Sequence, residues 1–97
     1  MKKAQEIQEI MRKYGNVSFS GGAIVIDIQG LNVYSISLTD FEAKIILRDH
    51  NMVVLRPGFI EFLYPLEYSG SFYGPAWPVK SSRVEIHDKL IRIYITF

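Results

Sequence analysis

The hydrophobic positions follow two different periods along the chain. Between residues 2 and 14 they recur every three or four residues, which is the spacing of one helical face. After Gly15 they alternate with polar residues, as in a strand with one buried face. The pattern predicts a helix over about 2–14 that Gly15 ends in a conformation of positive φ, followed by a β-rich region over about 16–97. The apolar helical positions are Ala4, Ile7, Ile10, Met11 and Tyr14.

Two-residue turns are predicted near both ends of the β-rich region. The glycines at 21–22 accept the positive φ values that a tight hairpin requires. A second turn at 88–89 joins two segments whose apolar positions match across it. The predicted cross-strand pairs are Phe19–Ile24, Val17–Ile26, Ile86–Ile91, Val84–Ile93 and Glu85–Arg92, the last as an ion pair.

Residues 30–32 and 49–51 are predicted to form three-residue hairpin loops. Each ends in asparagine, which tolerates the left-handed conformation that such a loop needs at its third position. The registers that follow bring apolar residues together in every inward pair. These pairs are Ile28–Tyr34, Ile26–Ile36, Ile24–Leu38, Leu47–Val53 and Ile45–Leu55.

The segment 40–49 fits two secondary structures. Thr39 and Glu42 have the spacing of a capping box that opens a helix. The residues that follow alternate between apolar and polar, which favours a strand. We favour the strand.

The elements together predict an α+β fold in one domain, 1–97. The N-terminal helix packs on an antiparallel meander of about seven or eight short strands, which either stays open or curls toward a barrel. A chain of 97 residues is long enough for one hydrophobic core. No segment has the roughly 18 consecutive apolar residues of a membrane span, and the N-terminus has no apolar signal segment, so we expect a cytoplasmic protein.

The composition excludes some chemistry. The chain has no cysteine, which excludes disulfides, thiolate catalysis and cysteine-ligated metal. Its net charge of +1 is too small for nucleic-acid binding by bulk charge. No catalytic or phosphate-binding motif is present, and we expect neither enzymatic activity nor a cofactor.

Three titratable sites have a functional and a structural interpretation. His50 follows Asp49 and His87 precedes Asp88, so a metal site would form if the two turns met. Histidine and aspartate are also ordinary turn residues, and we expect no metal. Asp27 lies among isoleucines, where it is either a buried catalytic acid or a residue of the solvent face. We favour the solvent face.

The segment 64–78 concentrates aromatic residues and prolines. As a surface, it resembles the aromatic anchors of protein interfaces, with Tyr68, Phe72, Tyr73 and Trp77 as candidate partner-binding residues. As structure, Tyr64 and Tyr68 lie on the core face of their strand, and the three aromatic residues that follow fold back as a lid on the core. A third interpretation is a platform for single-stranded nucleic acid, in which bases stack on the aromatic rings. The candidate phosphate-binding residues are Lys80, Arg83 and Arg92.

We expect a small non-enzymatic module that acts by protein association, as a homo-oligomer, an inhibitor or an accessory subunit. The aromatic segment and an exposed sheet edge would provide the contacts. The apolar strand at 93–97 is expected to be that edge, since it runs to the last residue. Single-stranded nucleic-acid binding is the alternative, and no membrane contact is expected.

Overall fold

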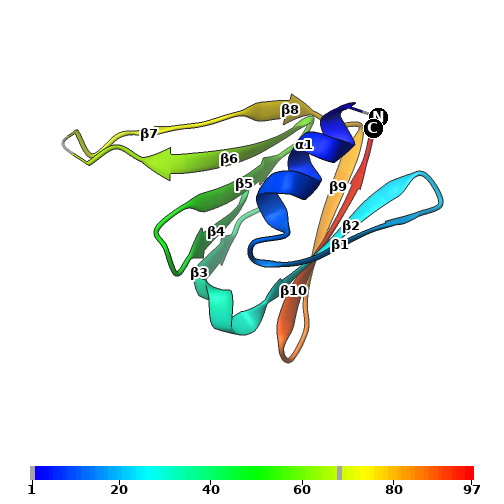
Figure 1. Cartoon of the computed structure of the whole chain (residues 1–97), viewed down its shortest axis with the longest axis horizontal. Coiled ribbons are helices and arrows are strands. Elements are labelled where there is room, and N and C mark those ends of the chain that lie inside the picture. The colour runs from blue at the N-terminus through cyan, green and yellow to red at the C-terminus, as the bar shows by residue number, and fades with distance from the viewer. Residues whose placement is uncertain (1, 68) are drawn as a thin grey trace.

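In the computed structural model, residues 2–67 and 69–97 are described, and they form one α-helix and ten antiparallel strands in two sheets (Figure 1). One sheet has the strand order β1-β2-β10-β9, and the other has the order β3-β4-β5-β6-β7 with β8 also paired to β6. The elements are α1 (Lys2–Met11), β1 (Gly15–Ser20), β2 (Ala23–Gln29), the 3₁₀ turn η1 (Gly30–Asn32), β3 (Val33–Leu38), β4 (Ala43–Leu47), β5 (Met52–Arg56), β6 (Phe59–Pro65), β7 (Phe72–Tyr73), β8 (Ala76–Pro78), β9 (Ser81–Ile86) and β10 (Leu90–Thr96).

The α+β class is confirmed, but the predicted arrangement of the strands is not. The expected seven or eight strands are too few, and the strands form two sheets instead of one meander. The sheets do not close into a barrel, because β3 and β9 end their sheets without pairing to each other. None of the helices in the described part of the chain is long and apolar enough to cross a bilayer.

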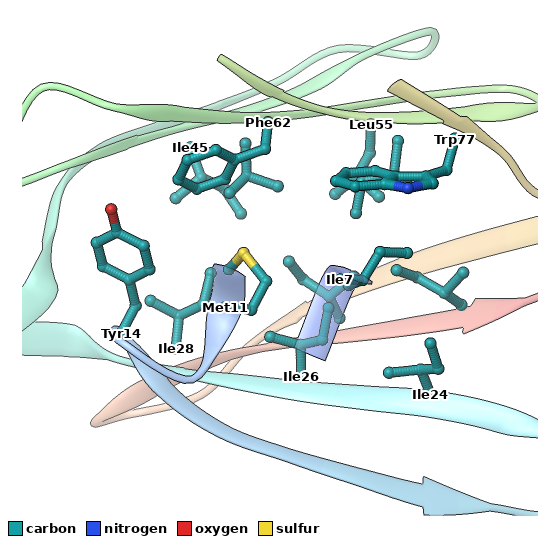
Figure 2. Packing of buried hydrophobic residues seen from close by; sticks show 14 of the residues in the cluster. Ile7, Met11, Tyr14, Ile24, Ile26, Ile28, Ile45, Leu55, Phe62 and Trp77 are labelled. Atoms are coloured by element: carbon teal, nitrogen blue, oxygen red, sulfur yellow. The ribbon is translucent and has the colours of Figure 1, made fainter. Parts of the chain in front are cut away.

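Helix α1 lies between the two sheets and fills the core from one side (Figures 1 and 2). Ile7 and Met11 project between the isoleucines of β2 and the side chains of β5, β6 and β8. Both are buried, and burial of an apolar side chain of this size contributes about 1.5–3 kcal/mol. The apolar stripe read from the sequence is therefore the face that joins the two sheets.

The predicted end of the helix is wrong. Helix α1 ends at Met11, and residues 12–14 form a turn that leads into β1. Gly15 has no positive φ. It is needed for another reason, since a Cβ on Gly15 would lie 1.7 Å from the carbonyl oxygen of Asp27 on β2.

The predicted hairpin at 30–32 is also wrong. Strand β2 pairs with β1 and β10, whereas β3 pairs with β4 in the other sheet. Turn η1 carries the chain between the sheets, and Gly30 N donates to Lys89 O (2.8 Å). Ile26 lies opposite Val17 and Ile93 instead of Ile36. An inward isoleucine matches any inward apolar residue, so the pattern cannot distinguish between these partners.

The C-terminal strand is not the expected edge. Strand β10 lies between β2 and β9, and Ile93 and Ile95 are fully buried. A strand of inward isoleucines buries most area in the middle of a sheet, which explains its position. The edges of the first sheet are β1 and β9, and β3 is an edge of the second.

Several local predictions are confirmed. The hairpins at 21–22 and 88–89 have the predicted registers, which place Phe19 opposite Ile24 and Glu85 opposite Arg92. The first turn has φ values of 55° and 80° at its two glycines. The pairs found as predicted at the two turns are Phe19–Ile24, Val17–Ile26, Ile86–Ile91, Val84–Ile93 and Glu85–Arg92. The ion pair predicted between Glu85 and Arg92 is wrong, because Arg92 binds Asp27 and Glu85 binds Arg83.

The segment 40–49 contains strand β4, as favoured, and the capping signature before it has another use. Thr39 Oγ1 accepts hydrogen bonds from Phe41 N (3.3 Å) and Glu42 N (3.1 Å), which form the turn between β3 and β4. The register between β4 and β5 differs from the prediction by two residues, since Ile45 lies opposite Val53. The shift follows from the turn at 49–51, in which His50 and not Asn51 has the positive φ (73°).

Candidate functional site

Trp77 is part of the core. It is 6% exposed, and its Nε1 donates a hydrogen bond to Glu6 Oε2 (2.8 Å) on helix α1. Its ring lies against the side chains around Leu55 and faces Ile7 (Figure 2). At this position the aromatic segment is therefore a lid on the core, and Trp77 is not accessible to a partner.

Phe72 and Tyr73 remain accessible on an arm formed by β6 and β7, which projects from the body of the protein (Figure 1). Tyr73 is 57% exposed and Phe72 is 45% exposed. A row of aromatic rings leads from the core to the arm, with centroid distances of 5.9, 5.0 and 5.8 Å between successive rings. The rings are those of Tyr14, Phe62, Tyr64 and Tyr73. The fourth candidate, Tyr68, lies outside the described residues.

Arg92 is already paired within the protein. Its guanidinium donates to both carboxylate oxygens of Asp27, at 2.7 and 3.1 Å. The hydrogen bonds from Arg92 hold the pKa of Asp27 below its ordinary value of 3.8. Asp27 thus lies on the outer face of the sheet, as favoured, and an internal carboxylate neutralises Arg92.

Lys80 directly precedes β9, and Arg83 is the third residue of that strand. Arg83 forms an ion pair with Glu85 (3.2 Å) on the same strand, and its guanidinium stacks over Tyr94 at 4.2 Å from the ring centroid. Strand β8 follows β7 in the chain and leads away from the arm toward β9 (Figure 1). Both residues are therefore remote from the aromatic arm. The candidate aromatic and phosphate-binding residues therefore do not converge on one surface.

The turns that carry the two histidines do not form one site. His87 Nε2 lies 3.0 Å from Glu85 Oε1, whereas Asp49 beside His50 is bound by Lys13 Nζ (3.1 Å). Within residues 2–67 and 69–97 no group of three or more histidine, aspartate or glutamate side chains is placed to hold a metal ion.

A hydrogen-bonded cluster around Tyr14 was missed by the sequence interpretation. Tyr14 Oη donates to Asp49 Oδ2 (2.7 Å) and accepts from Asn51 Nδ2 (2.9 Å). Burial and the neighbouring carboxylate raise the pKa of Tyr14 to about 12. Burial alone would raise the pKa of Asp49, but the hydrogen bonds from Tyr14, Lys13 and Asn51 lower it. The cluster ties the start of β1 to the turn between β4 and β5.

Strand β9 has an unpaired outer edge. In an antiparallel pair, every second residue turns its backbone N–H and C=O toward its neighbour. His87 N donates to Leu90 O (2.9 Å), so the register places Glu85 and Arg83 with their backbone groups toward β10 as well. In the described chain no strand lies on the other side of β9. The residues with outward backbone groups are Ser82, Val84 and Ile86.

An open groove of about 520 Å³ runs beside this edge, between β9 and the turns β3–β4 and β5–β6. Phe41, which is 77% exposed, and Leu38 supply its apolar surface. Arg56 in the groove is bound by Glu42 (3.0 Å) and by Glu61. The groove and the β9 edge, together the β9 groove, form the candidate interaction site.

The β9 groove could have been suspected from one signal in the sequence. Strand β9 places Arg83 and Glu85 two residues apart, and charged side chains are common on edge strands. The groove itself depends on turns that are distant in sequence, which no local pattern predicts. No protein-family model matches this chain, and no curated protein or solved structure is significantly similar to it.

Proposed function

We propose that this protein is a small non-enzymatic module that associates with another polypeptide along the outer edge of β9. The observation that supports it is the row of outward backbone groups at Ser82, Val84 and Ile86, of which Ser82 and Val84 line an open groove. An unpaired strand edge adds an extended segment of a partner through main-chain hydrogen bonds.

The side chains around the β9 groove suit an added strand. Alternate residues of an extended segment point to opposite faces, so one set would contact Leu38 and Phe41 in the groove. The other set would lie beside Arg83 and Glu85 on the outer face of the sheet. Main-chain bonds would thus supply affinity, and the two faces would supply specificity.

The aromatic arm is a second surface for the same kind of contact. Phe72 lies opposite Pro65 and Tyr73 lies opposite Tyr64, so the two exposed rings are on opposite faces of the arm. Exposed aromatic residues are enriched among the residues that dominate binding at protein interfaces. We assign the arm a supporting role, because it is short and Trp77 is buried.

Single-stranded nucleic-acid binding remains the alternative, with less support. Arg92 is neutralised by Asp27, and Lys80 and Arg83 lie away from the exposed rings of the arm. A stacking platform needs aromatic rings and cations along one track. The cytoplasmic location and the absence of catalysis also stay predictions.

A displayed library of random peptides tests the proposed function. Selected peptides are titrated into the labelled protein, and the amide chemical shifts of Ser82, Val84 and Ile86 are followed. The Ser82→Pro variant should lose the binding, since proline removes an outward N–H and leaves the bonds to β10 intact. Phe19→Pro on the outer edge of β1 is the matched control and should still bind. The proposal fails if neither peptides nor self-association perturb the β9 amides.

A further inference from the structure

We infer that the polypeptide that pairs with β9 is a second copy of this chain, bound antiparallel about a two-fold axis at Val84. This inference rests on the function proposed above and names its partner. The axis places Val84 opposite the partner's Val84 and Arg83 opposite the partner's Glu85. The β1-β2-β10-β9 sheet of one copy would then join the same sheet of the other copy into one continuous sheet across the axis.

The backbone of β9 is matched to this arrangement. The backbone N–H and C=O groups of every second residue of β9 point outward. With the axis at Val84, each residue whose groups point outward lies opposite such a residue of the other copy. Ser82 lies opposite the partner's Ile86, and Ile86 lies opposite the partner's Ser82. Three such pairs exchange two bonds each, so the contact forms about six main-chain hydrogen bonds.

The charges of β9 select one register. With the axis at Val84, each Arg83 lies directly opposite a glutamate of the other copy, on the outer face of the sheet. Moving the axis by one residue in either direction places Arg83 opposite Arg83 or Glu85 opposite Glu85. Like charges directly opposite each other are destabilising. Moving the axis by half a residue would shift the register of the two strands by one residue. The inner face of one copy would then lie on the side of the outer face of the other.

No other sheet edge in the described chain has two residues of opposite charge that could select a register. Strands β1, β3, β7 and β8 also lie at sheet edges, and none of them contains a charged residue. Arg83 and Glu85 pair with each other within one chain (3.2 Å), and both remain partly exposed. The second copy offers each of them an additional partner of opposite charge.

The groove also explains an exposed isoleucine. Ile86 shares the inner face of the sheet with buried Ile91, yet it is 59% exposed at the edge. Opposite the partner's Ser82 it would enter the end of the groove that contains Leu38 and Phe41. Pairing therefore removes an apolar side chain from water on both copies.

Variants that reverse the charge of Arg83 or of Glu85 test the inference. Sedimentation equilibrium of the unaltered chain should give twice the 11.2 kDa of one chain, with a concentration-dependent dimer. Arg83→Glu and Glu85→Arg should each weaken the dimer about tenfold or more, because each variant sets like charges opposite each other. An equimolar mixture of the two should form a heterodimer, and the double exchange in one chain should restore the homodimer. Circular dichroism confirms that each variant is folded.

The possible outcomes distinguish a wrong choice of partner from a wrong proposed function. A dimer that ignores both single charge variants, or a mixture that does not associate, overturns the proposed pairing. A chain that is monomeric up to about millimolar concentration overturns the second copy as partner. If library peptides still shift the β9 amides in that case, the proposed function stands with another partner. If they do not, the proposed function fails as well.

Discussion

Arg92 and Asp27 lie directly opposite each other on β10 and β2, and the guanidinium binds both carboxylate oxygens, at 2.7 and 3.1 Å. The pair joins two strands that are more than sixty residues apart in sequence. It lies on the outer face of the sheet, where Glu85 is the neighbour of Arg92 on the other side. The ion pair therefore marks the contact between the N-terminal and C-terminal hairpins.

We predict that Asp27→Asn lowers the melting temperature by a few degrees and changes its pH dependence. Arg92 lowers the pKa of Asp27 in the folded protein. The stabilisation is complete above the ordinary pKa of 3.8 and disappears as the pH falls through the lower folded pKa. Thermal unfolding between about pH 2 and 6 should show a smaller loss of stability on acidification in the variant. Equal losses in both proteins would contradict the role assigned to the pair.

Tyr14 should ionise only at strongly alkaline pH. Its pKa of about 12 predicts that one phenol titrates well above the ordinary value of 10.0. Because the folded pKa is raised, the stabilisation is present below pH 10 and is lost as the pH rises through 12. Ultraviolet difference titration of the chain against Tyr14→Phe measures the shifted group. A difference spectrum that titrates near pH 10 would contradict the cluster with Asp49.

The same substitution should destabilise the protein by about 1–2 kcal/mol. Tyr14→Phe removes the donor to Asp49 and the acceptor of Asn51, although Asp49 keeps its bond to Lys13. Urea unfolding measures the change, and Tyr34→Phe on exposed β3 is the matched control. A loss that is the same for both variants would mean that the cluster contributes nothing.

Trp77 should report a buried environment. Its fluorescence should be blue-shifted, weakly quenched by acrylamide and unchanged by single-stranded oligonucleotide at low salt. Trp77→Ala should cost about 3–5 kcal/mol in a urea titration, as expected for loss of a large core side chain. Emission at the wavelength of free indole would instead place Trp77 at the surface and reopen the aromatic segment as a binding site.

Gly15→Ala should be far more damaging than a glycine substitution in a turn. The new Cβ would lie 1.7 Å from the Asp27 carbonyl oxygen, so β1 must move away from β2. Gly21→Ala is the control, since it has positive φ (55°) and open space around it. It should cost only about 1–2 kcal/mol in urea unfolding. Similar losses at both positions would contradict the close approach of the strands.

The hairpins could be predicted because each depends on a few neighbouring residues. The glycines at 21–22 determine one turn, and the alternation on either side determines its register. The pairing of β2 with β10 could not be predicted in this way. Ile26 fits opposite Ile36 as well as it fits opposite Ile93, because each partner is an inward apolar residue. The choice depends on how the whole core fills, with α1 between the sheets.

The candidate site was predicted only in part. An exposed edge strand was expected at 93–97 instead of β9. The expectation was wrong because the position of a strand in the chain does not decide whether it pairs on both sides. Phe72 and Tyr73 are exposed, whereas Trp77 from the same segment is held in the core by Glu6. Trp77 and Glu6 are 71 residues apart in the sequence, and no local pattern around Trp77 predicts their contact.

Amide hydrogen exchange along β9 shows whether a polypeptide pairs with the outer edge of this strand. Arg83 and Glu85 donate toward β10, so their amides should be protected at every protein concentration. The outward amides of Ser82, Val84 and Ile86 should exchange rapidly in dilute protein and become protected at high concentration or with a selected peptide. If these three amides exchange equally fast under all of these conditions, no polypeptide pairs with the edge of β9.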